Sequence, residues 1–238
     1  MPAIDQLKVK LYADGADRDG MLEMYEQPYI QGFTTNPTLM KKVGISDYEA
    51  FAHDILRSIP DRPISFEVFA DEFDEMERQA LKIKTWGDNV FIKIPISNTR
   101  KEMSYDLIER LSEAGVRLNI TAILTLDQVR NVAEAVKNGP ESIVSVFAGR
   151  IADTGLDPVP IMGEALEILK VAPRAELLWA SPREVLNIYQ ADAIGCHIIT
   201  ATNDIIRKLS LASKDLAQYS LETVQMFYDD AQKAGYSL

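Results

Sequence analysis

The sequence predicts an α/β fold, a single (β/α)₈ TIM barrel with a C-terminal helical extension, formed by residues 1–238 as one domain. Short β-branched or apolar runs alternate with longer stretches of helical periodicity, which is typical of repeated βα units around a parallel sheet. About eight such units follow one another at nearly uniform spacing. The length of 238 residues is usual for one α/β barrel, and no linker or shift in composition divides the chain.

The strand candidates are short segments rich in β-branched and aromatic residues, each followed by a helix-like segment. They are KVKLYAD (8–14), QGFTTN (31–36), PISFEVFA (63–70), NVFIKIPIS (89–97), RLNITAIL (117–124), SIVSVFAG (142–149), AELLWAS (175–181) and HIITATN (197–203).

Four helices are clear between these strands, with Asp or Thr near several starts and Gly or Pro at the ends. They are predicted within 72–87, 101–115, 125–139 and 157–173. After the last strand, residues 219–238 carry an apolar stripe that a barrel does not require, formed by Leu221, Val224, Met226 and Phe227. We expect this C-terminal helix to pack on a neighbouring subunit.

Composition and charge exclude several classes of protein. The chain is 47% hydrophobic and 26% charged, as in ordinary globular proteins. Its net charge of −11 has no basic block, so nucleic acid is not an expected partner. The N-terminal segment has no apolar signal-peptide core, and no stretch approaches the length of a membrane span. We therefore expect a cytoplasmic protein without membrane contact.

Cysteine and histidine are too few for most metal or thiol chemistry. The single cysteine, Cys196, lies in an apolar run and is expected to be a buried thiol. The two histidines, His53 and His197, lack metal-ligand spacing, so we expect both to be structural and no metal site to be present.

Strand parity identifies a buried amine. Alternate side chains of a barrel strand face the outer helices and the interior. In VFIKIPI, the β-branched positions from Val90 to Ile96 form one apolar face, which directs Lys93 inward. Burial disfavours an ammonium, and the neutral amine is the form that attacks a carbonyl to make a Schiff base. The alternative is a lysine that snorkels to solvent or pairs with an acid.

Other strands also direct polar groups inward, and this convergence favours the functional interpretation of Lys93. The inward positions are Ser65 and Glu67 on the third strand, Asn119 and Thr121 on the fifth, and Ser145 and Phe147 on the sixth. Glu67 is a second buried ionisable group at a similar depth.

More polar residues lie near the carboxyl ends of strands, where barrel enzymes place their active sites. The first strand ends in Asp14, the second in Thr35 and Asn36, and the seventh in Ser181. Asp14 and Asn36 have an alternative role as caps of the helices that follow them.

Two arginines follow adjacent strand ends. Arg150 comes after the sixth strand, and Arg183 comes after Ser181 at the end of the seventh. Guanidinium and hydroxyl groups suit phosphate oxygens, so this sector of the rim is a candidate anion site. Surface salt bridges are the alternative.

Together these sequence segments resemble the transaldolase family, which includes the fructose-6-phosphate aldolases. The resemblance runs from LYADGAD through the last strand. The motifs that carry it, in the family's order, are FTTNPTL (33–39), FIKIPIS (91–97), LNITAIL (118–124), SVFAGRIAD (145–153) and WASPREVLN (179–187). The family's fold is the barrel predicted above.

The resemblance implies catalytic roles for four residues. Lys93 matches the Schiff-base lysine, and Asp14 matches the acid/base at the cleaved carbon–carbon bond. Glu67 and Thr121 match the residues that hold a catalytic water. The implied reaction uses no metal or organic cofactor.

The resemblance also implies two sets of binding residues. The residues matched to the dihydroxyacetone part are Asn36, Asn119 and Ser145. Those matched to the phosphate are Arg150, Ser181 and Arg183. The partners implied are sugar phosphates, and the compact branch of the family forms ring-shaped homo-oligomers, pentamers or decamers.

Two positions distinguish transfer from simple cleavage. The transaldolases have Glu on the third strand and Phe on the sixth, where the aldolase branch tends to carry Gln and Tyr. Glu67 and Phe147, the latter beside the substrate, therefore favour transfer of a dihydroxyacetone unit from a ketose phosphate, fructose 6-phosphate by family default, to an aldose phosphate.

Three alternatives remain open at the level of sequence. One is a lyase that releases free dihydroxyacetone, and another is a related aldolase for a specialised sugar. The third is an inactive barrel that serves as a binding protein. The chain departs from the family's usual words at SNTRKE (97–102), GRIADTG (149–155) and Pro182, which leaves the sugar open.

Overall fold

The computed structural model, described for residues 2–236, is a closed barrel of eight parallel strands in the order of the sequence. The barrel closes where β1 pairs with β8, with Lys10 opposite Ile198 and Asp14 opposite Thr202. The strands are β1 (Lys10–Asp14), β2 (Ile30–Thr34), β3 (Ile64–Glu67), β4 (Val90–Pro95), β5 (Leu118–Ile123), β6 (Ser142–Val146), β7 (Ala175–Trp179) and β8 (Ile198–Thr202). The predicted (β/α)₈ fold class is confirmed.

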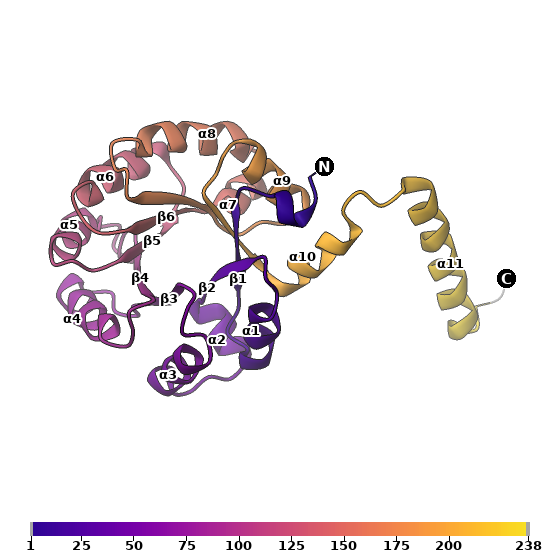
Figure 1. The fold of residues 1–238 in the computed structure, drawn as a ribbon, viewed down its shortest axis with the longest axis horizontal. Helices are drawn as coiled ribbons and strands as arrows, with labels where there is room; N and C mark the ends of the chain where they lie inside the picture. The colour runs from indigo at the N-terminus through magenta and orange to yellow at the C-terminus, as the bar shows by residue number, and fades with distance from the viewer. Residues whose placement is uncertain (1, 237–238) are drawn as a thin grey trace.

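Most of the helices lie around the strands as an outer layer (Figure 1). In chain order the helices and 3₁₀ turns are η1 (Ile4–Gln6, a 3₁₀ turn), α1 (Arg18–Tyr25), α2 (Pro37–Lys42), α3 (Tyr48–Ser58), α4 (Phe73–Lys84), α5 (Tyr105–Glu113), α6 (Leu126–Val136), α7 (Ala148–Asp153), α8 (Pro158–Leu169), α9 (Leu186–Ala193), α10 (Asn203–Arg207), η2 (Lys208–Leu211, a 3₁₀ turn) and α11 (Leu216–Ala234).

Side-chain caps fix where several helices begin. Asp17, Asp47 and Asp157 each accept a hydrogen bond from a backbone N–H in the first turn of α1, α3 and α8. Thr125 and Gln128 form a capping box at the start of α6. These caps set the point at which each loop leaves the carboxyl end of its strand.

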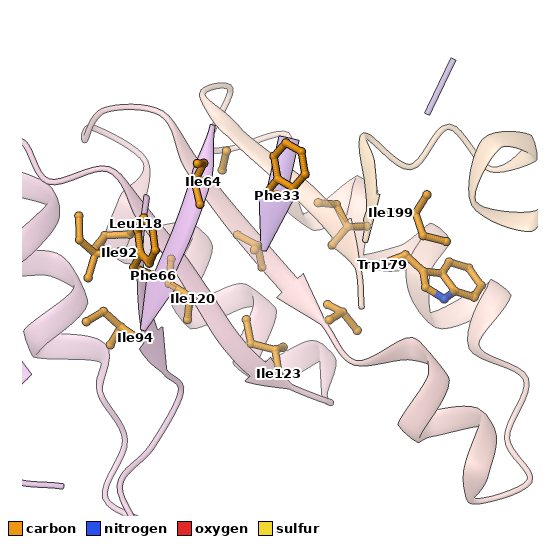
Figure 2. Close-up of a cluster of buried hydrophobic side chains, with 14 of the residues drawn as sticks. Phe33, Ile64, Phe66, Ile92, Ile94, Leu118, Ile120, Ile123, Trp179 and Ile199 are labelled. Atoms are coloured by element: carbon orange, nitrogen blue, oxygen red, sulfur yellow. The ribbon is translucent and has the colours of Figure 1, made fainter. Parts of the chain in front are cut away.

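The buried apolar side chains of the described residues form two clusters. The larger lies between the strands and the helix layer, and Figure 2 shows its strand residues, among them Phe66, Ile92 and Ile120. A smaller cluster fills the barrel interior and contains Tyr12, Phe91 and other residues, with Phe147 packed against it. This division matches the predicted parity, because Ile92 belongs to the outer cluster and Phe91 to the inner one.

The predicted strand ends require correction. The segment 142–149 was expected to be strand throughout. In the structure β6 ends at Val146, and helix α7 begins two residues later at Ala148. In the same way Asn203 opens α10 and does not extend β8. Arg150, predicted to follow the sixth strand, therefore lies within α7.

Helix α11 stands apart from the barrel at the end of a connecting segment (Figure 1). None of its residues is buried, and Val224, Phe227 and Tyr228 are more than 60% exposed. The helix begins three residues before the predicted segment 219–238, whose residues 237 and 238 lie outside the described part. An apolar helix in the predicted place is therefore present.

Within the described residues, no helix has the length and apolar character that a membrane crossing requires.

Candidate active site

Lys93 lies in the middle of β4 and points into the barrel. Its side chain is 8% exposed, and its Nζ is 3.0 Å from Oε2 of Glu67 on the adjacent strand β3. The same nitrogen donates a hydrogen bond to the backbone oxygen of Thr35 at 2.8 Å. Register places Glu67, Lys93 and Asn119 opposite one another on three successive strands. Lys93 is therefore buried, as strand parity predicts, and it is also paired with an acid, which was part of the alternative interpretation.

Asp14 ends β1 beside two polar neighbours. The Thr34 hydroxyl donates to Oδ1 at 2.7 Å, and Nδ2 of Asn36 donates to Oδ2 at 3.2 Å. Burial raises the pKa of Asp14 above its ordinary value of 3.8, although the Lys93 charge and these two hydrogen bonds act in the opposite direction. A carboxylate with a raised pKa, held by neutral donors, is a stronger base than an ordinary aspartate and is suited to proton exchange with a substrate.

The capping alternatives for these residues differ in outcome. Helix α1 is capped by Asp17, which accepts from Gly20, so Asp14 is free of that role. Asn36 does cap α2 through Oδ1, which accepts from the Leu39 N–H at 2.9 Å. Because its Nδ2 still reaches Asp14, Asn36 has both roles at once.

Three polar side chains form a hydrogen-bonded network across the barrel interior. Ser145 Oγ donates to Asn119 Oδ1 at 2.6 Å, and Asn119 Nδ2 donates to Ser65 Oγ at 2.9 Å. Asn119 is fully buried, and the two serines are nearly so. Since every member has a partner, the network holds the Asn119 amide in one orientation beside Lys93.

Thr121 is buried next to an irregular step in β5. The register of β5 against β6 shifts between Ile120 and Ile123, and Ala122 adopts a φ of 63°, in the left-handed region. Such a bulge changes the direction of the neighbouring side chains. Thr121 is buried, and Phe147 is half-buried against the interior cluster, as strand parity predicts for Phe147.

The two arginines of the predicted anion site lie near each other at the rim, but one is already paired. Arg183 donates through Nε to Asp153 Oδ1 at 3.0 Å and through Nη2 to Oδ2. Both Arg183 and Arg150 contribute to holding the pKa of Asp153 below its ordinary value. Arg150 is exposed, with its guanidinium 5.2 Å from the centre of the Phe147 ring. For Arg183, the salt-bridge alternative therefore describes this structure.

Backbone geometry brings Ser181 against the start of α7. Gly149 N donates to the Ala180 oxygen at 3.2 Å, and a Cβ on Gly149 would lie 1.5 Å from the Ser181 oxygen. Only glycine allows this approach. Ser181 itself has a φ of 58°, a strained conformation of the kind that gathers at functional sites.

A cavity of about 330 Å³ joins Asp14 to this anion sector, at the carboxyl ends of β1, β7 and β8. It is lined by Asp14, Ser181, Pro182, Arg183, Thr200, Thr202 and Ile205. A larger cavity of about 910 Å³ lies at the opposite ends of the strands, where Lys10, Arg117 and Glu176 line it. Because catalytic groups of barrel enzymes occupy the carboxyl ends, the smaller cavity is the open part of the candidate active site, and its lining includes Asp14 but not Lys93 or Glu67.

Comparison with known proteins identifies the family of the chain. Residues 11–238 match the sequence model of the transaldolase/fructose-6-phosphate aldolase family. The chain belongs to this family. It is 31% identical over 202 residues to a protein of Dehalococcoides mccartyi described as a probable transaldolase, covering 84% of this chain and 90% of that protein. It is 30% identical to a protein of Methanococcus maripaludis with the same description, covering 84% and 89%.

Solved structures with little sequence similarity share the fold of this transaldolase-family chain. Dihydrodipicolinate synthase from Rhodopseudomonas palustris aligns with a TM-score of 0.58 at 14% identity, covering 93% of this chain and 80% of that one. KGPDC from Streptococcus mutans aligns with a TM-score of 0.55 at 11% identity, covering 84% and 90%. At these identities the similarity concerns the barrel alone.

The structure adds neighbours that sequence reasoning did not single out. Thr200 shares a hydrogen bond of 2.6 Å with Thr34 and lines the cavity, and strand parity applied to β8 would have found it. Two further neighbours are Asp153, which pairs with Arg183, and Tyr48, whose hydroxyl group contacts the Glu67 backbone. Both partners are distant in sequence. Cys196 is a buried thiol as expected, with its pKa raised by burial to about 12, and His197 accepts a backbone hydrogen bond from Leu177.

Proposed function

We propose that this transaldolase-family protein transfers a dihydroxyacetone unit from a ketose phosphate, fructose 6-phosphate by family default, to an aldose phosphate through a Schiff base at Lys93. The observation that carries the proposal is the Lys93 amine, buried inside the barrel and held between a carboxylate at 3.0 Å and a carbonyl oxygen at 2.8 Å. An amine held in this way is suited to attack a carbonyl substrate and form a Schiff base.

The first step proposed is attack on the ketone. Glu67 accepts a proton from the Lys93 ammonium over their 3.0 Å contact, and the neutral amine adds to the ketone carbon. The adduct loses water to give a protonated imine. By resemblance to the family, Glu67 and Thr121 hold that water, and Asn36, Asn119 and Ser145 bind the three-carbon unit.

In the second step the carbon–carbon bond breaks. Asp14 takes the proton of the hydroxyl group beyond the three-carbon unit, the bond electrons move to the imine, and an aldose phosphate leaves. The raised pKa of Asp14 suits this role, because the same carboxyl must return the proton when the acceptor aldehyde is attacked. The enamine left on Lys93 then adds to that aldehyde, and hydrolysis of the new imine frees the product.

Phe147 supports transfer over release of free dihydroxyacetone. It offers a ring without a hydroxyl group against the interior cluster, so it cannot help water to protonate the enamine. Arg150, Ser181 and Arg183 would bind the phosphate, and the substrate would then compete with Asp153 for the Arg183 guanidinium.

The test is reductive trapping. The protein is incubated with fructose 6-phosphate and borohydride, and peptides are mapped by mass spectrometry. A dihydroxyacetone adduct is expected on Lys93, and it should be lost in Lys93→Ala. The matched control is Lys10→Ala, which removes a lysine paired with Glu176 at the opposite end of the barrel and should leave trapping unchanged. An unmodified Lys93 across a panel of ketose phosphates would sink the mechanism.

Transfer is distinguished from cleavage by a second measurement on the same protein. Turnover of fructose 6-phosphate is followed with and without erythrose 4-phosphate as acceptor. The proposal predicts turnover that depends on the acceptor, whereas free dihydroxyacetone accumulating at the same rate in its absence would identify a lyase.

A further inference from the structure

The ladder between β2 and β3 stops one step early, beside the candidate active site. Phe33 N donates to the Pro63 oxygen at 2.9 Å, and Thr35 N donates to the Ser65 oxygen at 3.2 Å. In a regular parallel ladder the next bond would run from the Glu67 N–H to the Thr35 oxygen. Here the Thr35 oxygen instead accepts from the Lys93 amine at 2.8 Å.

The Tyr48 side chain takes the place of β2 at this step. The Glu67 N–H donates to Tyr48 Oη at 2.8 Å, and Tyr48 Oη in turn donates to the Glu67 oxygen at 3.1 Å. In a strand both backbone groups of one residue point to the same neighbour. One hydroxyl group thus satisfies both backbone groups of Glu67 on the side of β2, where residue 37 is a proline and has no N–H for the Glu67 oxygen.

Packing fixes the hydroxyl in this position. Tyr48 is the first residue of α3, whose start is set by Asp47 accepting from the Ala50 N–H at 2.9 Å. Its ring lies 4.6 Å from that of Phe69 and 5.5 Å from that of Trp86, measured between centroids. The ring contacts are apolar, so they do not depend on the hydroxyl group.

We propose that Tyr48 is a positioning residue for the Lys93 amine. Its hydroxyl group occupies the hydrogen-bonding place of β2 at Glu67 and so leaves the Thr35 oxygen available to hold the Lys93 nitrogen. That oxygen and the Glu67 carboxylate are the two acceptors that orient the amine. The catalytic consequence rests on the function proposed above, and the structural consequence does not.

Tyr48→Phe tests this directly, because it removes the hydroxyl group and keeps the ring packing. A buried N–H without a partner is costly, so the Glu67 N–H will turn to the Thr35 oxygen and compete with Lys93 for it. Since misplacement of a reacting group costs rate and not substrate binding, kcat should fall about tenfold while KM stays within about twofold. Borohydride trapping of the Lys93 adduct should slow by the same factor.

Tyr25→Phe is the matched control. The Tyr25 hydroxyl group donates to Asp61 at 2.6 Å on the surface, so the change removes one hydrogen-bonded hydroxyl group away from the site. It should leave kcat, KM and trapping as in the unmodified protein. Thermal unfolding of both variants reports any loss of fold. Partial unfolding would lower the fraction of active protein, but it would leave the KM and the trapping rate per folded molecule unchanged.

A crystal structure of Tyr48→Phe needs no substrate and separates the two proposals. Movement of the Lys93 nitrogen away from the Thr35 oxygen supports the positioning role, even where no ketose phosphate labels Lys93 and the proposed function fails. A Lys93 nitrogen still bonded to Thr35 in that variant overturns the positioning role. Unchanged kcat and trapping in a variant of a protein that does form the adduct overturns it as well.

Discussion

Lys93 and Glu67 are opposite one another on adjacent strands, and their Nζ and Oε2 atoms lie 3.0 Å apart with side chains 8% and 17% exposed. Lys93→Met leaves the carboxylate without its cation, which should cost about 3 kcal/mol of unfolding free energy, at the low end for a buried pair. Lys93→Met combined with Glu67→Gln should recover most of this loss. Urea denaturation of both variants measures it, and equal instability of the two would contradict an energetic pairing.

Asp14 gives the molecule a pH dependence of definite sign. Burial is the largest influence on its pKa and raises it above 3.8. The folded protein therefore holds this proton more tightly than the unfolded chain. The stability contributed is complete below the unfolded pKa and is lost as pH rises through the folded pKa. Asp14→Asn does not titrate, so its Tm should rise relative to that of the unmodified protein across this window.

The check is the difference in Tm between the two proteins, measured from about pH 4 to about pH 8. A difference that stays constant with pH would show that burial does not shift Asp14. Activity gives an independent reading, since loss of a general acid/base should lower kcat by about 10²- to 10⁴-fold.

Phe147→Tyr introduces a hydroxyl group where the chain now has a bare ring against the barrel interior. Such a group can orient water toward the enamine, so release of free dihydroxyacetone should rise about tenfold relative to transfer, a change of about 1.4 kcal/mol in relative barriers. Both products are quantified from one reaction with fructose 6-phosphate and erythrose 4-phosphate. A ratio equal to that of the unmodified protein would refute this account of position 147.

Asp153→Asn should strengthen substrate binding. The Arg183 guanidinium is held by both oxygens of Asp153, and a bound phosphate must displace them. Without the competing charge, KM for fructose 6-phosphate should fall about threefold, the size expected for release of an exposed ion pair. The control is Glu134→Gln, which breaks an exposed pair with Lys137 at the far end of α6. A KM that rises in Asp153→Asn would mean that Asp153 positions Arg183 for the phosphate.

The sequence predicts the barrel and the inward set of polar residues because both follow from local alternation. β4 is the clearest case, since its β-branched face leaves Lys93 only one direction. The strand ends are less predictable. Val146 and Ala148 have similar apolar character, so no local pattern separates the last strand residue from the first helical one, and the close approach of Gly149 to Ser181 beside them is a tertiary contact.

The side-chain pairings within the site cannot be predicted from any local sequence pattern. Asp153 lies 30 positions before Arg183, and Tyr48 lies 19 positions before Glu67, so tertiary structure alone brings each pair together. In each contact a group binds one of two partners that are available to it. Arg183 is paired with a carboxylate in place of a phosphate, and the Glu67 backbone is paired with a hydroxyl group in place of a strand.

The last prediction concerns α11, whose apolar side chains belong to neither apolar cluster of residues 2–236. Val224 is 61% and Phe227 63% exposed, and an apolar surface of this kind on a 19-residue helix is characteristic of a protein contact. We expect α11 to pack on a second copy of the chain. The unmodified protein is then expected to sediment as an oligomer, and Val224→Asp combined with Phe227→Asp as a monomer, because each new charge would be buried in the contact. Gln225→Asp adds a charge on the same helix at a polar, exposed position and should leave the assembly intact. If the double variant sediments as the unmodified protein does, α11 is not the contact surface.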